Sequence, residues 1–289
     1  MFIMVNAGMA KRKPQGPNHG RSDPRGGGDR RPREQRQNDR HQGRERPSGR
    51  GHAGGRYWLY GHHAVIAALS NPDRRCGELL VTAGYKEAHG DNPAFAGAAV
   101  ASRQDLDAVL PEGAVHQGIA LQVMPLPDRD LDDVFGAESP SPSDCVAVLD
   151  QATDPRNIGA VLRTAAAFGI RCVIVQDRNA PPETGTMAKA ASGALEHVPL
   201  VRVTNLAREL ETLKNRGFWC IGLDGHAEAN LSEMRMDGPT AFVFGAEGRG
   251  LRRLTRETCD VLARIPLSDK VESLNLANAA SIALYEWAR

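Results

Sequence analysis

The sequence predicts an α/β protein built around a parallel sheet, and three observations lead to this fold class. From residue 145 onward, short continuous apolar runs alternate with helical patterns, as in parallel strands covered by helices on both faces. A smaller set of strand and helix patterns precedes them, and the N-terminal stretch has almost no apolar content. We therefore predict four parts: an Arg/Gly-rich arm (1–55), a small α/β domain (57–127), a linker (128–144) and a larger α/β domain (145–289).

The arm differs from the rest of the chain in charge. Residues 1–55 carry 13 Lys and Arg against 5 Asp and Glu, whereas the remainder carries 23 against 30, although the whole chain has a net charge of +1. A segment with so few apolar side chains cannot offset its ordering entropy, so we expect disorder. Its arginines would contact phosphates without reading sequence, which favours a nucleic-acid partner. A merely solubilising tail is the alternative.

The small domain shows its elements in order. Apolar spacing predicts a helix over 61–69 and a strand over 78–81, followed by a short helix near 106–110 and a strand over 119–123. A Pro/Ser-rich stretch, residues 136–144, then marks the linker.

The larger domain has a regular pattern of alternating elements. Strands are expected at 146–149, 172–175, 218–223, 241–244 and 261–265, with an extended segment at 198–203. Helices are expected at 157–168, 186–195, 206–215, 251–259 and 276–287. Gly169 and Gly217 follow two of these helices, as glycine does at many helix C-termini.

Composition excludes several protein classes. No apolar run approaches the ~20 residues that span a bilayer, so we expect a cytoplasmic protein. The five cysteines are scattered and none forms a C-x-x-C pair, which argues against disulfides and a zinc site. Cys172 and Cys220 lie in apolar runs and are expected in the core, and no metal is predicted.

The first segment that suggests chemistry runs from Leu149 to Thr164, where a strand leads into a helix. Ligands of open α/β sheets bind at such strand ends. Asn157 is well placed as a helix N-cap, which is its ordinary role. Arg163 lies off the apolar stripe of the helix, so it faces either a cleft or solvent.

Two further segments carry glycines and polar residues. Phe242 to Leu251 takes a strand through three glycines into a helix, but it lacks the Lys-Ser/Thr of a P-loop and the G-x-G-x-x-G spacing. It is either a ligand loop or a plain tight turn. In the third segment, Ile265-Pro266-Leu267 is followed by Ser273 and Asn275, for which helix capping is the default explanation.

Together, these segments resemble the signature motifs of the SpoU (TrmH-type) RNA methyltransferases of the SPOUT superfamily. The matches are N-x5-R, G-A-E-G-x-G-L and I-P-L followed by S-L-N, in that order. Tyr60 to Val65 and His116 to Ala120 resemble the family's small substrate-binding domain. The resemblance implies an L30e-like small domain, a trefoil knot in the parallel-sheet domain and a homodimer with shared active sites.

The resemblance also implies a reaction and roles for particular residues. The cofactor would be S-adenosylmethionine and the substrate a ribose 2′-hydroxyl of RNA, most closely a guanosine in the peptidyl-transferase loop of 23S rRNA. Arg163 would stabilise the developing oxyanion, since guanidinium is too basic to act as a base. The other expected catalytic residues are Asn157, Glu247, Ser273 and Asn275. The expected cofactor contacts are Gly245, Ile265 and Leu274, with Gly248 and Gly250.

Three alternatives stay open at this point. The same chemistry could act on tRNA, although the separate small domain favours rRNA. A non-catalytic RNA-binding or ribosome-assembly factor would explain the arm alone. A conventional Rossmann-type methyltransferase would carry its glycine-rich loop after the first strand, where residues 150–156 contain no glycine.

Overall fold

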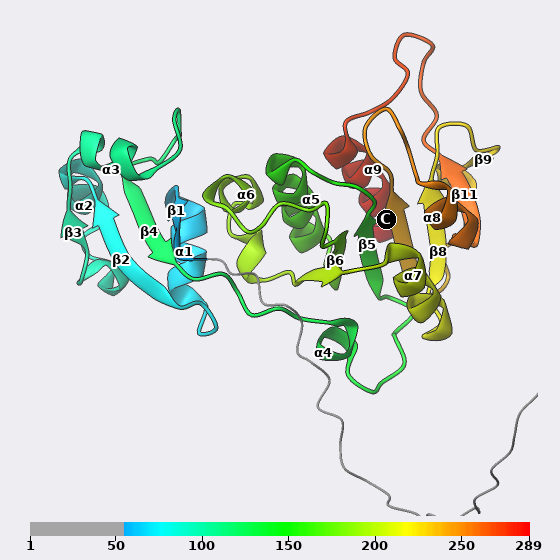
Figure 1. Cartoon of the computed structure of the whole chain (residues 1–289), viewed down its shortest axis with the longest axis horizontal. Coiled ribbons are helices and arrows are strands. Elements are labelled where there is room, and N and C mark those ends of the chain that lie inside the picture. The colour runs from blue at the N-terminus through cyan, green and yellow to red at the C-terminus, as the bar shows by residue number, and fades with distance from the viewer. Residues whose placement is uncertain (1–54) are drawn as a thin grey trace, which may run out of the picture. The chain divides into compact units, whose positions relative to one another are not determined.

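The computed structural model describes residues 55–289, so the predicted disorder and RNA contacts of the arm lie outside the described residues. Two β-sheets organise the described part of the chain (Figure 1). We call them the small sheet, with strands β1–β4, and the large sheet, with strands β5–β11. Within residues 55–289, no helix is long and apolar enough to cross a membrane.

The small sheet has the strand order β1-β4-β2-β3. Its central strand β4 pairs antiparallel with both β1 and β2, and β3 pairs parallel with β2. The strands are β1 (Tyr57–Tyr60), β2 (Cys76–Val81), β3 (Ala99–Val100) and β4 (Ile119–Val123). The helices are α1 (His62–Ser70), α2 (Ala83–His89) and α3 (Arg103–Val109), with a 3₁₀ turn at Pro93–Phe95.

The four elements predicted for this region are confirmed, and three others had escaped prediction. Strands β1 and β3 have only four and two residues, too short for a clear alternation. In helix α2 only Tyr85 is buried, so no apolar stripe marks it in the sequence.

The large sheet has the order β7-β6-β5-β10-β8-β11-β9, and every pairing in it is parallel, as predicted. Its strands are β5 (Cys145–Leu149), β6 (Cys172–Gln176), β7 (Leu200–Val203), β8 (Trp219–Leu223), β9 (Ala229–Asn230), β10 (Thr240–Phe244) and β11 (Val261–Arg264). Its helices are α4 (Leu131–Phe135), α5 (Pro155–Ala167), α6 (Gly185–Ala191), α7 (Leu206–Asn215), α8 (Arg253–Thr258) and α9 (Leu276–Ala288), with 3₁₀ turns at Ala194–Glu196 and Leu231–Glu233.

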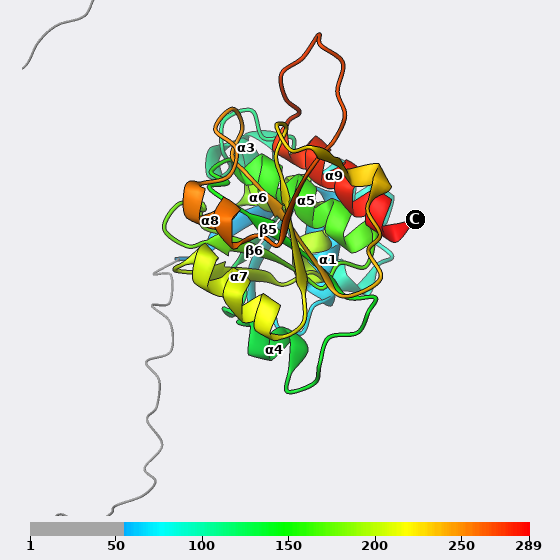
Figure 2. The same ribbon diagram turned by 90° about the vertical axis from the view of Figure 1, so that its right-hand side faces the viewer.

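Helices cover both faces of the large sheet (Figure 2). Alternate strand residues such as Ala147 and Phe242 pack with α5 and α9 in one core, whereas Val146 and Val243 pack with α4 and α7 in another. Central strands buried on both faces explain why they are continuous apolar runs in the sequence. Cys172 and Cys220 are fully buried in the second core, as predicted, and burial raises the pKa of the Cys172 thiol to about 12.

Two predicted elements of this region differ from the structure. The helix expected over 186–195 ends at Ala191, because Ser192 and Gly193 adopt left-handed backbone with φ of 52° and 94°. The segment 128–144, predicted as a linker, contains α4, whose Leu131 and Phe135 side chains are buried in the core.

A buried ion cluster joins the elements of the small sheet to those of the large sheet. The Arg74 side chain is fully buried, and its guanidinium donates to Glu196 at 2.6 and 3.0 Å and to Glu183 at 3.0 Å. Burial alone would lower the pKa of Arg74, but the bonds to Glu196 and the nearby charge of Glu183 raise it. Next to this cluster, a Cβ on Gly185 of α6 would lie 2.2 Å from the carbonyl oxygen of Trp58 in β1, so only glycine allows this approach.

Candidate active site

The three segments singled out in the sequence follow strands of the large sheet. Residues 150–154 follow β5, residues 245–252 follow β10, and residues 265–275 follow β11 and lead into α9. Because β5 and β10 are neighbouring parallel strands, their carboxyl ends open at the same edge of the sheet. The structure therefore brings together loops that lie about a hundred residues apart in the chain.

Glu247 connects all three loops. Its Oε1 atom accepts hydrogen bonds from the side-chain amides of Asn157 and Asn275, each at 2.8 Å. The Asn275 amide also donates to Asn157 Oδ1 at 3.0 Å. Three of the five predicted catalytic residues thus form one hydrogen-bonded group.

The N-cap role expected for Asn157 is wrong. Asp154 caps α5 by accepting from the Arg156 N–H at 2.8 Å, and Pro155 takes the first helical position, which leaves Asn157 two residues inside the helix. Asn157 is therefore free to bond Glu247. Asn275 does cap its helix: its Oδ1 accepts from the Ala277 N–H at 2.8 Å while its amide nitrogen reaches Glu247.

A buried carboxylate holds the end of the glycine loop. Asp150 is fully buried directly after β5, and it accepts from the Arg252 backbone at 3.0 Å and from the Arg252 guanidinium at 2.7 Å. The helix was predicted to begin at Leu251. This contact explains why α8 begins at Arg253 instead. Because the glycine loop is fixed at its far end, it can present a defined surface.

The loop closes tightly on itself at its first glycine. Ala246 and Gly250 exchange backbone hydrogen bonds of 3.2 and 2.9 Å, and Gly248 and Gly250 have φ of 75° and 64°. A Cβ on Gly245 would lie 2.2–2.5 Å from the backbone of Gly250 and Leu251. The loop conformation therefore requires a residue without a side chain at position 245.

Gly245→Ala should weaken cofactor binding by about tenfold or more, since the loop must open to admit the methyl group. Isothermal titration with S-adenosylmethionine measures this. Gly238→Ala is the matched control, because nothing lies within 4 Å of its added Cβ and its φ is not positive. Equal affinities for the two variants would contradict the steric requirement.

A cavity of about 650 Å³ lies between the glycine loop and the loop that precedes α9. All five residues predicted to contact the cofactor line it: Gly245, Gly248, Gly250, Ile265 and Leu274. Ser273 and Glu247 line it too, and so do Asp224, His226 and Arg256. Its size lies within the ordinary range of small-molecule sites, and it combines apolar walls with a few charged groups.

A second cavity of about 320 Å³ adjoins the first at Glu247. It is lined by the loop after β5 and by Asn157, and it shares Ala246, Glu247, Arg249 and Leu276 with the larger cavity. At its wall, Gln151 has a φ of 62°, a strained backbone for a residue other than glycine. Two adjoining cavities that share Glu247 in their walls have room for two reactants side by side.

Arg163 does not join this group within a single chain. It is exposed on α5, lines neither cavity, and makes no hydrogen bond or ion pair with any residue of 55–289. The neighbouring Thr164 contacts Ser281 of α9 at 3.0 Å, and the Phe168 and Tyr285 rings lie 6.0 Å apart along the same two helices. Arg163 therefore stands beside the α5–α9 contact.

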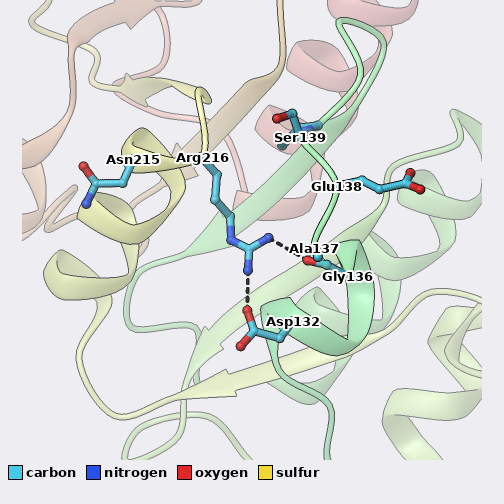
Figure 3. Close-up of a pocket in the computed structure, with 8 residues that line it drawn as sticks. Asp132, Gly136, Ala137, Glu138, Ser139, Asn215 and Arg216 are labelled. Atoms are coloured by element: carbon cyan, nitrogen blue, oxygen red, sulfur yellow. Dashed lines mark hydrogen bonds and ion pairs between the residues drawn. The ribbon is translucent and has the colours of Figure 1, made fainter.

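Another cavity lies at the opposite edge of the large sheet (Figure 3). Its walls are the end of α7 and the segment that leads from α4 into β5. Arg216 crosses it to bond Asp132 and the carbonyl oxygen of Gly136 (Figure 3). Since none of the three loops reaches this edge, we assign it no part in the reaction.

Several groups at the site are not predictable from local sequence patterns. Arg249 occupies the variable position of the glycine motif, yet it lines both cavities. Asp150 and Arg252 lie 102 residues apart, so no local pattern reveals their contact. The Asp154-Pro155 pair, by contrast, is a recognisable helix-start signal that would have corrected the role of Asn157. In the described part of the chain, no cluster of histidine, cysteine and acidic residues could hold a metal.

Comparison with known proteins gives matches in both halves of the described chain. Residues 144–285 match the model of the SpoU rRNA Methylase family, and residues 58–128 match that of the RNA 2′-O ribose methyltransferase substrate-binding domain. The 23S rRNA (guanosine-2′-O-)-methyltransferase RlmB of Vibrio vulnificus is 42% identical over 241 residues, which cover 80% of this chain and 96% of that protein. RlmB of Pseudomonas syringae is 40% identical over 239 residues, covering 79% and 93%.

Solved structures share the fold. The SpoU methyltransferase AviRb from Streptomyces viridochromogenes, in complex with AdoMet, has a TM-score of 0.67 at 24% identity and covers 81% of this chain and 89% of that one. A TrmH-family protein from Porphyromonas gingivalis has a TM-score of 0.61 at 26% identity, with 80% and 89% covered. The family model matches residues 144–285, and relatives above 40% identity match most of the chain. The chain therefore belongs to the SpoU rRNA methylase family.

Proposed function

We propose that this protein transfers a methyl group from S-adenosylmethionine to the ribose 2′-hydroxyl of a guanosine in 23S rRNA. The observation that carries the proposal is the convergence of the three loops on Glu247, which places two adjoining cavities at one sheet edge. The RlmB relatives, which match over nearly their whole length, supply the substrate. The position in the peptidyl-transferase loop stays a prediction.

The residues of the larger cavity fit the cofactor. Leu223, Ile265 and Leu274 offer an apolar wall for an adenine ring, and the tight turn at Gly245 exposes backbone groups. Arg256 and His226 offer donors for a carboxylate, while Asp224 and Glu272 carry charge opposite to a sulfonium. When bound, the cofactor supplies an activated methyl group whose departure leaves a neutral thioether.

The chain's own residues must then orient the ribose and stabilise an alkoxide-like oxygen. We place the ribose in the smaller cavity, where Asn157 and Arg249 can contact its hydroxyl and phosphate groups. Asn275 holds the loop before α9 through Glu247, and Ser273, which lines the larger cavity, would orient the substrate. Arg163 is the proposed cation that stabilises the developing negative charge.

We further propose that Arg163 reaches this position from a second copy of the chain. Helix α9 carries two exposed apolar side chains, Ile282 and Tyr285, with 42% and 56% of their surface accessible, and the Tyr285 ring lies 6.0 Å from that of Phe168 at the end of α5. Large apolar side chains clustered on one face favour contact with another protein surface. A homodimer across α5 and α9 would cover them and could place each Arg163 near the partner's loops.

The remaining features of the proposal are expectations from the sequence. The trefoil knot and the roles of a substrate-binding domain (57–127) and a methyltransferase domain (145–289) come from the resemblance. The bounds of these domains come from the pattern of elements, and the cytoplasmic location comes from the composition. The crossing order of the large sheet, in which β10 lies between β5 and β8, is compatible with a knotted chain.

Purified protein with tritiated S-adenosylmethionine should label 23S rRNA that lacks the modification, and should not label tRNA. Mapping the labelled nucleotide by nuclease digestion should give a single 2′-O-methylguanosine. Labelling of tRNA in preference to rRNA would replace the proposed substrate. Binding of RNA without any cofactor binding would favour a non-catalytic role.

A further inference from the structure

A cluster of aromatic rings on the small-sheet side lies outside the site described above. His62 begins α1, and its ring lies 5.3 Å from the ring of His63 and 5.0 Å from that of His89. The Tyr85 ring lies 4.5 Å from that of His89, and its hydroxyl is 2.7 Å from His62 Nδ1. We call His62, His63, Tyr85 and His89 the ring cluster.

The ring cluster has a buried side, formed by Tyr85, and a side that is accessible to solvent. Tyr85 is buried and packs edge-on against Phe95, with the two rings 5.6 Å apart. His63 and His89 are exposed and His62 is half-buried. Three of the six histidines in residues 55–289 gather here, around Tyr85, which itself belongs to the core. Metal binding does not explain them, since no metal-holding cluster occurs among the described residues.

The structure holds the ring cluster in place by an unusual turn. Gly61 provides no side chain to cap α1, and the Gln117 side chain does so instead by accepting from the His62 N–H at 3.1 Å. Gln117 and the following Gly118 both have left-handed backbone, with φ of 59° and 83°. Strained backbone is retained where the surrounding structure fixes it, and it often marks a functional site.

Positive charge lies beside the rings. Lys189 of α6 donates to the same Gln117 oxygen at 2.7 Å, which places its ammonium group next to the start of α1. Lys86 is the neighbour of Tyr85 on α2 and is exposed. Burial and the two other histidines lower the pKa of His62.

Flat rings with cations at their edge are the surface on which unpaired RNA bases stack, while the cations meet phosphates. We propose that the ring cluster is a stacking platform for an unpaired base of the RNA substrate, with Lys86 and Lys189 contacting the adjoining backbone. This inference rests on the proposed function, because it takes RNA as the ligand. It adds a second contact point, distinct from the two cavities of the large sheet.

The test compares RNA binding and methylation by the intact chain and by the double variant His62→Ala/His89→Ala. The first probe is a short single-stranded RNA carrying 2-aminopurine, whose fluorescence falls on stacking. The double variant should bind it about 5- to 150-fold more weakly and lose the quenching, as expected for the loss of one stacked base. The KM for 23S rRNA should rise similarly, while kcat and the affinity for S-adenosylmethionine stay within about twofold.

Two further variants separate stacking from other causes. His62→Phe/His89→Phe keeps flat rings without their nitrogen atoms and should restore quenching and KM to near the original values. His197→Ala removes an exposed histidine outside the cluster and should change neither. A Phe variant as weak as the Ala variant would overturn the stacking role, and so would an equal loss in His197→Ala.

The outcomes distinguish this inference from the proposed function. If the intact protein methylates 23S rRNA and the double variant has an unchanged KM and unchanged quenching, the platform alone is wrong. If the intact protein transfers no methyl group to RNA, the proposed function fails, whatever the 2-aminopurine probe shows.

Discussion

Arg163→Ala should lower the rate of methyl transfer by at least about 10²- to 10³-fold, the usual effect of removing a group that stabilises a developing oxyanion. The affinity for S-adenosylmethionine should stay unchanged, because Arg163 does not line the cavity assigned to the cofactor. Single-turnover methylation of 23S rRNA and isothermal titration measure the two effects separately. Arg208→Ala, which removes an exposed arginine of α7, is the matched control and should keep full activity.

The proposed homodimer makes this prediction sharper. If each Arg163 serves the partner's site, then mixing Arg163→Ala protein with Gly245→Ala protein, at a cofactor concentration too low to fill the altered loop, should restore activity. A mixed dimer would contain one site with both an intact loop and an intact arginine. Near-normal turnover by Arg163→Ala alone would reject the catalytic role, and a strictly monomeric active protein would reject the shared site.

Arg74→Ala should lower the free energy of unfolding by about 3–5 kcal/mol, because it leaves two carboxylates without their cation. The side chains of Glu183 and Glu196 are only 11% and 2% exposed, so water cannot replace the guanidinium. Urea unfolding gives the value. Arg129→Ala breaks an exposed pair with Asp73 and should cost less than about 1 kcal/mol.

The same cluster allows a stricter test of the cause. Replacing Arg74 by Met while Glu183 and Glu196 become Gln removes every charge and should recover much of the lost stability. If this triple variant were as unstable as Arg74→Ala, lost packing rather than an unpaired buried charge would be responsible. A cost for Arg74→Ala no larger than that for Arg129→Ala would contradict the prediction altogether.

The parallel sheet was predictable because its central strands are buried on both faces. Runs such as Cys172 to Val175 show this as unbroken apolar sequence, and turn residues mark their ends. The break at Ser192 was not predictable, since serine gives no warning of a left-handed backbone. Nor were β3 and β9, which have two residues each and are strands only through their neighbours.

At the site, the sequence indicated which residues to consider but not how they meet. Glu247 was expected among the catalytic residues, and the structure gives it Asn157 and Asn275 as partners. Such contacts depend on the order of strands in the sheet, which periodicity does not contain. Asp150 illustrates this limit, since its partner Arg252 is specified only once β5 and β10 are neighbours.

The single side-chain amide of Asn275 both caps α9 and contacts Glu247. The stability of this helix is therefore coupled to ligands that bind beside Glu247. The amide oxygen closes the first turn of α9 while the amide nitrogen reaches toward Glu247 and Asn157. A ligand that displaces the Asn275 amide from Glu247 also removes the cap of α9. A ligand that strengthens the contact between Asn275 and Glu247 stabilises the start of that helix. Hydrogen–deuterium exchange at the Ala277 N–H therefore reports whether the three loops remain in contact. The measurement needs neither a fluorescent label nor catalytic turnover.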